Sequence, residues 1–176
     1  MPYSVIATLD SNLGVAVEKM WETLASIGIA SEGEVQGNHP HITLGVYNVA
    51  NKCVAASKAI RDLAAVRQGA NVTLSGYGIF PGERCTLWAV PIVTRELLAL
   101  HRELHGSVTS DDPHYAPDRW VPHVTLAREL AAATAIAGLD ALAPAWQGPH
   151  GTLARIELIS FVPVVVLGSY SFESRR

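Results

Sequence analysis

A five-residue string occurs twice in this chain, once as Pro40–Leu44 (PHITL) and again as Pro122–Leu126 (PHVTL). Its two histidines stand at positions 41 and 123, so that one copy falls in each half of the 176 residues. With this composition, we expect one such string by chance in well under about one per thousand chains, and a matched pair is far rarer. The repeat therefore predicts two related halves, each of which carries a strand of the same design.

Both copies suit a β-strand, in which alternate side chains point to opposite faces. His41 and Thr43 then share one face, and His123 and Thr125 share the equivalent face of the second strand. We expect the aliphatic residues on the other faces to be buried: Ile42, Leu44, Val124 and Leu126. If the two halves face each other, two imidazoles and two hydroxyls meet in one cleft.

Such a cleft is suited to displacement at a phosphorus atom. A neutral imidazole accepts a proton from the attacking oxygen, and an imidazolium donates one to the leaving oxygen, each with a pKa close to neutral pH. The hydroxyls donate hydrogen bonds to the non-bridging phosphoryl oxygens, where charge gathers in the transition state. This chemistry requires no metal. The alternative is that both His-x-Thr pairs are surface or capping residues on two strands.

Apolar periodicity and turn residues predict strands and helices that interleave without strict alternation. Strands are expected at residues 3–9, 41–47, 71–80, 85–93, 121–127, 152–161 and 164–172. Helices are expected over Leu13–Ile27, over Asn51–Val66 with Val54, Ile60 and Leu63 inward, from a Thr94 cap to Val108, and over Glu129–Leu142. This order predicts an α+β fold with mostly antiparallel sheets. No linker or charge run divides residues 1–176, so we expect a single domain.

At the two motifs the chain resembles the 2H phosphoesterase superfamily, which includes 2'-5' RNA ligase-like proteins and cyclic phosphodiesterases. The shared pattern is two His-x-Thr/Ser motifs roughly eighty residues apart. The resemblance implies two lobes, one motif in each, with a pseudo-twofold duplication of the sheets, flanking helices and a central cleft. It also implies metal-independent action on RNA-type phosphodiesters or cyclic phosphates, with catalytic roles for His41, Thr43, His123 and Thr125. The continuation Ala127-Arg128 is similar to the RNA-ligase-like branch, whereas Gly45 follows the first motif with no basic residue.

Three residues around the second motif are candidates for substrate binding. The Arg128 guanidinium can pair with a phosphate, or it can form a salt bridge with a neighbour such as Glu129. Trp120 and Tyr115 can stack on a base, or they can pack into the wall of the cleft. Tyr115 belongs to the polar, turn-rich segment 109–119, which we expect to be a lid or a wall of the cleft.

The remaining histidines give weaker signals. His39 is either a partner of His41 or an exposed loop residue. His101 and His105 are four apart on a predicted helix, a spacing typical of metal ligands, but the string is not His-Glu-x-x-His. We therefore expect a solvated helix face there and no metal site. His114 carries no specific signal.

Charge and cysteine content limit the partners and the compartment. Thirteen Lys and Arg against sixteen Asp and Glu give a formal charge of -3, which argues against a basic face for a long nucleic-acid duplex. Cys53 and Cys85 fit no metal-ligand spacing, and we expect reduced thiols, with one disulfide left open. The first residues do not form a signal peptide, and no apolar run is long enough for a bilayer. We expect a cytoplasmic protein without membrane contact.

Together these features predict an enzyme. We expect a metal-independent phosphodiesterase that hydrolyses 2',3'-cyclic nucleotides, RNA cyclic-phosphate ends or a related small cyclic phosphate, as a monomer and without a cofactor. One alternative is a 2'-5' RNA ligase or 2'-5' phosphodiesterase. The other is a non-catalytic module that binds a nucleotide or an RNA end, although such a module would need no pair of proton donor and acceptor.

Overall fold

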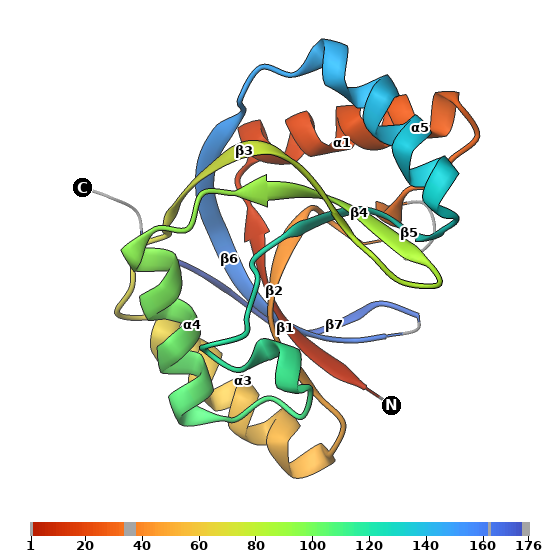
Figure 1. The fold of residues 1–176 in the computed structure, drawn as a ribbon. Coiled ribbons are helices and arrows are strands. Elements are labelled where there is room, and N and C mark those ends of the chain that lie inside the picture. The colour runs from red at the N-terminus through yellow and green to blue at the C-terminus, as the bar shows by residue number, and fades with distance from the viewer. Residues whose placement is uncertain (1, 34–37, 162, 174–176) are drawn as a thin grey trace.

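The computed structural model describes residues 2–33, 38–161 and 163–173, in which strands and helices are interleaved (Figure 1). In chain order the elements are β1 (Tyr3–Leu9), α1 (Ser11–Ser26), β2 (His41–Tyr47), α3 (Ala50–Ala64), β3 (Asn71–Phe80), β4 (Cys85–Pro91), α4 (Arg95–Ser107), η1 (Pro113–Tyr115), β5 (Val124–Leu130), α5 (Ala132–Leu142), η2 (Ala143–Ala145), β6 (His150–Ser160) and β7 (Val165–Ser171). The mixed content and the antiparallel pairing confirm the predicted α+β class.

All the strands that the structure describes belong to one antiparallel sheet. Their order is β2-β1-β6-β3-β4-β5, and β7 pairs with β6. β3 and β6 are joined only between Asn71–Thr73 and His150–Thr152. This short junction separates two parts of the sheet, which we call the first lobe (β1, β2, β6 and β7) and the second lobe (β3, β4 and β5).

The helices that follow β1 and β4 cross to the opposite lobe. α1 packs against α5 and β5, and α4 packs against α3 and β2 (Figure 1). Each of these helices buries a stripe at helical spacing: Leu13, Val17, Trp21 and Leu24 in α1, and Leu97, Leu100, His101 and Leu104 in α4. Because each half of the chain sends one helix to the other lobe, the two lobes are interlocked.

Two side chains fix where these crossing helices begin. The Asp10 carboxylate accepts a hydrogen bond from the backbone N–H of Leu13 at 2.9 Å. Thr94, the predicted cap of the helix after β4, accepts one from the backbone N–H of Leu97 at 3.2 Å. Both contacts satisfy an N–H group that has no partner within its own helix.

Two boundaries near the second motif differ from the prediction. β5 begins at Val124 and not at residue 121, because Pro122 has no backbone N–H to give to the ladder. α5 begins at Ala132 and not at Glu129. Glu129 still belongs to β5, and its φ of 57° lies outside the helical region.

Two apolar residues of the predicted helices are exposed, one of which, Val54, we expected to point inward. Val54 is 73% exposed because it lies off the stripe with which α3 packs on the sheet, formed by Ala56, Ala59, Ile60 and Leu63. Ile27 is 47% exposed because it follows the last residue of α1, where the chain turns at Gly28 with a φ of 79°.

Cys53 on α3 is partly exposed and Cys85 on β4 is buried, and both are free cysteines in the structure. Among the described residues, no helix combines the length and the apolar character that crossing a membrane requires.

Candidate active site

The two His-x-Thr motifs meet although they lie far apart in the chain. β2 and β5 stand at opposite ends of the strand order, yet they contact each other. His41 and Thr125 are each 8% exposed, and Thr43 and His123 are partly exposed. The four aliphatic residues are at most 2% exposed, as the strand alternation predicts: Ile42, Leu44, Val124 and Leu126.

Each motif histidine is oriented by the backbone two residues before it. His41 Nδ1 lies 2.6 Å from the carbonyl oxygen of His39, and His123 Nδ1 lies 2.8 Å from that of Val121. Because a carbonyl oxygen can only accept, Nδ1 carries a proton in both rings. Nε2 then holds a lone pair in the neutral imidazole and a proton in the imidazolium. The same atom of each ring is therefore available as base or as acid.

The motif residues line two adjoining cavities. The larger, of about 440 Å³, is lined by His123 and Thr125, among others. The smaller, of about 100 Å³, is lined by His41. Thr43, Tyr115 and Arg128 line both cavities, so the four motif residues surround one continuous cleft.

Burial lowers the pKa of both motif histidines. The pKa of His41 falls to about 4, mainly because the ring is desolvated. The carbonyl of His39 opposes this shift, and the charges of Arg128 and His123 add to it. The pKa of His123 is lowered by burial and by Arg128. Both rings are therefore neutral near pH 7 in the free protein, and a bound phosphate anion would raise both pKa values.

A β-bulge follows each motif and decides which residue next reaches the cleft. The pairing of β1 with β2 leaves out Leu44, and the pairing of β4 with β5 leaves out Leu126. Each bulge turns two successive residues toward the core and returns the next one to the cleft. That residue is Val46 after the first motif and Arg128 after the second, and both line the smaller cavity. An arginine is thus present at only one of two equivalent positions.

Arg128 is paired with Glu32 and not with Glu129, the neighbour suggested by the sequence. Its Nη2 donates to Glu32 Oε1 at 2.7 Å. The Glu32 side chain is 3% exposed, and burial raises its pKa while Arg128 opposes that shift. Gly33 lets this segment lie against Trp21, because a Cβ there would stand 2.5 Å from Cε3 of the indole. The carboxylate is thereby fixed, while the guanidinium stays half exposed in the cleft.

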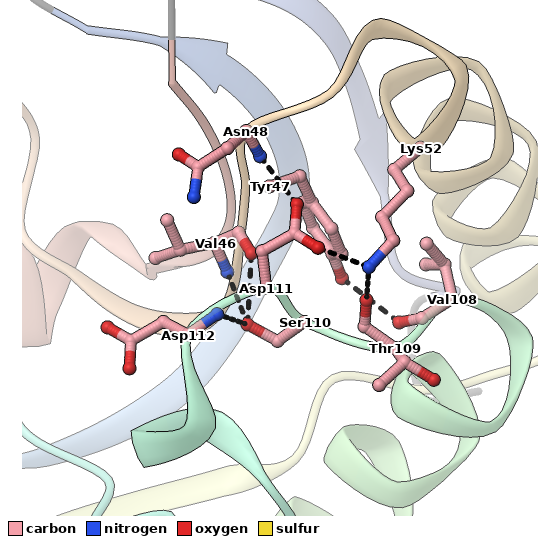
Figure 2. A network of polar contacts seen from close by, with 9 residues as sticks. All are labelled: Val46, Tyr47, Asn48, Lys52, Val108, Thr109, Ser110, Asp111 and Asp112. Carbon is pink, nitrogen blue, oxygen red and sulfur yellow. Dashed lines mark hydrogen bonds and ion pairs between the residues drawn. The ribbon is translucent and has the colours of Figure 1, made fainter.

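Segment 109–119 is anchored as a wall of the cleft, one of the two roles predicted for it. Ser110 Oγ accepts from the backbone N–H of Val46 at 3.1 Å and donates to the carbonyl oxygen of Val46 at 3.0 Å. The Asp111 carboxylate accepts from the backbone N–H of Asn48 at 2.7 Å and pairs with Lys52, which also donates to the Thr109 carbonyl (Figure 2). These contacts join the segment to the end of β2 and the start of α3.

Tyr115 and Trp120 both contact Thr43. Burial raises the pKa of the Tyr115 phenol, and a hydrogen bond with the Thr43 side chain opposes this shift. The Trp120 indole N–H donates to the Thr43 carbonyl oxygen at 3.1 Å, and one face of the ring stacks on His101 at 3.8 Å. Trp120 is 7% exposed and lines the larger cavity, so it packs as wall. Stacking of either ring on a base stays a prediction.

Two aromatic residues of the site were not identified from the sequence. Phe80 lines the larger cavity, with its ring 5.0 Å from that of His123 and stacked on Trp88 at 4.7 Å. The Trp21 indole N–H donates to the backbone carbonyl of Thr125 at 3.3 Å. The helical apolar pattern indicated only that Trp21 is buried, and no local signal separates Phe80 from other strand aromatics.

His101 differs from the prediction of a solvated helix face. It is 1% exposed because α4 turns it inward onto Trp120. Neither ring nitrogen has a hydrogen-bond partner of normal geometry. Burial lowers the pKa of His101 to about 4, although the nearby backbone of Tyr115 opposes this shift. It is therefore a neutral core residue at neutral pH.

The other histidines lie near the cleft without joining the four motif residues. His39 is an exposed loop residue, as one interpretation predicted. It is also a partner of His41, but through its backbone carbonyl and not through its ring. His114 is 88% exposed at the rim of the larger cavity and pairs with Asp112 at 2.9 Å. Within the described part of the chain, no three His, Cys, Asp or Glu side chains are grouped so as to hold a metal ion.

The chain is similar to one known family and in fold to several solved structures. The family model described as the 2'-5' RNA ligase superfamily matches residues 15–162. TT0787 of Thermus thermophilus superposes with a TM-score of 0.66 at 18% identity over 98% of both chains. E. coli LigT in its apo form superposes with a TM-score of 0.61 at 16% identity over 98% of both chains. Kluyveromyces marxianus Usb1 superposes with a TM-score of 0.57 at 10% identity, over 94% of this chain and 97% of the Usb1 chain. No curated protein matches the sequence.

Proposed function

Because this chain belongs to the 2'-5' RNA ligase superfamily, we propose that it is a phosphodiesterase that hydrolyses 2',3'-cyclic nucleotides, RNA cyclic-phosphate ends or a related small cyclic phosphate. The observation that carries the proposal is the matched orientation of two histidines in one cleft. Each Nδ1 is held by a carbonyl oxygen, which leaves Nε2 of His41 and of His123 for proton transfer.

The reaction then proceeds as an in-line displacement. Nε2 of one neutral histidine takes a proton from water as the water oxygen forms a bond to phosphorus. The bond from phosphorus to the 2' or the 3' oxygen of the ribose breaks, and Nε2 of the other, protonated histidine gives its proton to that oxygen. The product is a phosphate monoester, and a proton exchange with solvent resets the two rings. Which histidine acts as base depends on the direction of the reaction.

Thr43, Thr125 and Arg128 would stabilise the negative charge on the non-bridging phosphoryl oxygens. The two hydroxyls sit beside the histidines on the same strand faces, and Arg128 lines both parts of the cleft. Hydroxyl donors and a guanidinium fixed before substrate arrives lower the barrier more than mobile groups do. No step of this mechanism needs a metal ion.

The larger cavity would hold the nucleoside. Its volume of about 440 Å³ lies in the range of small-ligand sites, and Phe80, Tyr115 and Trp120 supply aromatic walls. E. coli LigT, which shares the fold, has been solved with 3'-AMP and with phosphate. The net charge of -3 also favours a short substrate, since each phosphate contact of a long RNA needs its own cation.

Incubation with 2',3'-cyclic nucleotides and with 2'-5' linked dinucleotides, each with and without EDTA, tests the proposal. We expect a nucleoside monophosphate from the cyclic substrates at a rate that EDTA leaves unchanged. Turnover of the 2'-5' linked dinucleotides alone would favour the 2'-5' phosphodiesterase alternative. Tight binding without any turnover would favour a binding module, and loss of activity in EDTA with rescue by a divalent ion would contradict the metal-free mechanism.

A further inference from the structure

The cleft face of the first lobe continues beyond His41, across β1 to β6 and β7. The strand registers align one row of directly opposite residues on this face: His41, Thr8, Arg155 and Ser171. Directly opposite residues on neighbouring strands share a face. Since neighbouring strands lie about 4.8 Å apart, the backbone of Arg155 stands roughly 10 Å from that of His41 on the same face of the sheet.

Arg155 is held in place by side chains of β6 and β7. Its Nε donates to Ser169 Oγ at 2.7 Å, and its Nη1 donates to Ser171 Oγ at 3.0 Å. Glu157 Oε1 lies 3.4 Å from Nε and accepts a further hydrogen bond from the Ser169 hydroxyl. The Glu157 side chain is 9% exposed, whereas that of Arg155 is 45% exposed. The buried carboxylate thus orients the guanidinium, which faces solvent.

The guanidinium keeps unused donors. Of its five N–H groups, both on Nη2 and one on Nη1 have no partner among the residues that the structure describes. Arg155 lines a cavity of about 620 Å³ together with Thr8, Ser169 and the first turn of α1. A helix N-terminus adds a partial positive charge to such a cavity.

Besides Glu157, two acidic residues line this cavity, and their effect on an anion differs. The Asp10 carboxylate is already engaged by the backbone N–H groups of Leu13 and Thr152 and by the Thr152 hydroxyl. Glu18 is exposed on α1, beyond the first turn of the helix, where solvent screens its charge. The fixed, directed charge that the cavity offers to an anion is therefore that of Arg155.

We propose that Arg155 binds a second phosphate of the substrate, so that the enzyme prefers oligonucleotide ends to single nucleoside cyclic phosphates. This inference rests on the proposed function of the cleft. A guanidinium with two donors free on one edge matches two phosphate oxygens. Phosphates are about 3.4 Å apart along the axis of a helical strand and further apart in an extended one. Two or three nucleotides therefore bridge the distance from the reacting phosphate at His41.

Steady-state kinetics on two substrates test this inference: a nucleoside 2',3'-cyclic phosphate and a trinucleotide that ends in the same 2',3'-cyclic phosphate. We expect Arg155→Gln to raise KM for the trinucleotide on the order of 10-fold, with kcat unchanged. KM for the nucleoside 2',3'-cyclic phosphate should stay within about twofold of the wild-type value. Ser171→Ala, which removes one acceptor from Nη1, should raise the trinucleotide KM by a smaller factor. Arg61→Gln on α3 is the matched control, because it removes an exposed arginine outside the cleft.

Equal effects of Arg155→Gln on the two substrates, or no effect on either, would overturn the second-phosphate site. If the wild type cleaves neither substrate, the proposed function fails, and the site is then tested by binding alone. A fluorescent trinucleotide 3'-monophosphate should bind Arg155→Gln on the order of 10-fold more weakly than the wild type. Unchanged binding in that assay would overturn the site independently of catalysis.

Discussion

The indole N–H of Trp120 donates to the backbone carbonyl oxygen of Thr43, and the distance between the two atoms is 3.1 Å. Trp21 makes the equivalent contact with the carbonyl oxygen of Thr125 at 3.3 Å. In both cases a tryptophan from one half of the chain holds the His-x-Thr strand of the other half. The two motifs are thus fixed relative to each other by a reciprocal pair of hydrogen bonds.

Trp120→Phe should therefore weaken both stability and catalysis. The substitution keeps an aromatic ring against His101 but leaves the Thr43 carbonyl without its donor, which costs about 1 to 3 kcal/mol when the acceptor is buried. We expect a lower urea midpoint and a kcat reduced by roughly 10-fold, because Thr43 is no longer held in register with His123. Trp146→Phe, at a tryptophan that packs on Tyr77, is the control. Equal kcat losses in both variants would contradict a specific role for the Trp120 hydrogen bond.

Replacing either motif histidine should lower kcat far more than it weakens substrate binding. His41→Ala or His123→Ala removes one partner in proton transfer, and we expect kcat to fall by on the order of 10² to 10⁴ with a much smaller change in substrate affinity. Because both rings act in one transition state, the double variant should lose less than the product of the two single losses.

His114→Ala is the matched control for these variants. His114 lines the same cavity as His123, but its side chain is 88% exposed and pairs with Asp112, so the kcat of this variant should stay within about threefold of the wild type. Wild-type turnover in both His41→Ala and His123→Ala, on every cyclic phosphate that the protein cleaves, would show that the acid–base roles are assigned wrongly.

The sequence was informative wherever the chemistry depends on strand alternation. His-x-Thr on a strand specifies which side chains share a face, so the burial of Ile42 and Val124 and the cleft position of the motif residues could be predicted. The burial of His101 on α4 could not be predicted, because apolar periodicity does not distinguish a buried histidine from a solvated one. His101 is buried only because Trp120, from a distant loop, offers its ring face. Contacts of this kind depend on tertiary packing and leave no local pattern.

The bulges at Leu44 and Leu126 mark a second limit. Strict alternation from Thr125 would turn Arg128 toward the core, and only the extra residue of the bulge returns it to the cleft. The amino-acid composition of the strand does not predict that extra residue. The partner of Arg128, Glu32, is also nearly a hundred positions earlier, beyond the reach of any spacing argument.

Arg128→Gln should lower kcat/KM by roughly 10- to 100-fold, because it removes the charge that lies between the two motifs. Val46 occupies the equivalent position after the first motif, so Val46→Ala provides a control at the same cavity without a change in charge. We expect that control to lose less than about threefold in kcat/KM. Equal losses in the two variants would mean that Arg128 contributes only packing.

The pH dependence should differ between the free enzyme and its complex. A pKa of about 4 for His41 and a lowered pKa for His123 mean that the form in which one ring is protonated and the other neutral predominates only on the acid side of pH 6.5. The profile of kcat/KM should therefore be bell-shaped with a maximum below pH 6.5. A bound phosphate anion raises both pKa values, so the maximum of kcat should lie at higher pH. A kcat/KM that rises steadily through about pH 8 would contradict this assignment.

His101→Phe should remove part of the acid sensitivity of the fold. Burial lowers the pKa of His101 to about 4, and the charges of His105 and Arg102 add to the shift. The unfolded chain therefore binds a proton near pH 6.5 that the folded chain does not accept until about pH 4, so stability falls as pH decreases through this window. Phenylalanine keeps the stack on Trp120 and has no ring nitrogen to protonate.

On acidification from pH 7 to pH 5, we expect the wild type to lose roughly 2 kcal/mol more of its free energy of unfolding than the His101→Phe variant loses. Urea unfolding at the two pH values measures this difference, and His150→Gln, at an exposed histidine on β6, is the control. If His101→Phe and the wild type lose the same stability on acidification, His101 does not titrate differently in the two states and its burial has no effect on acid unfolding.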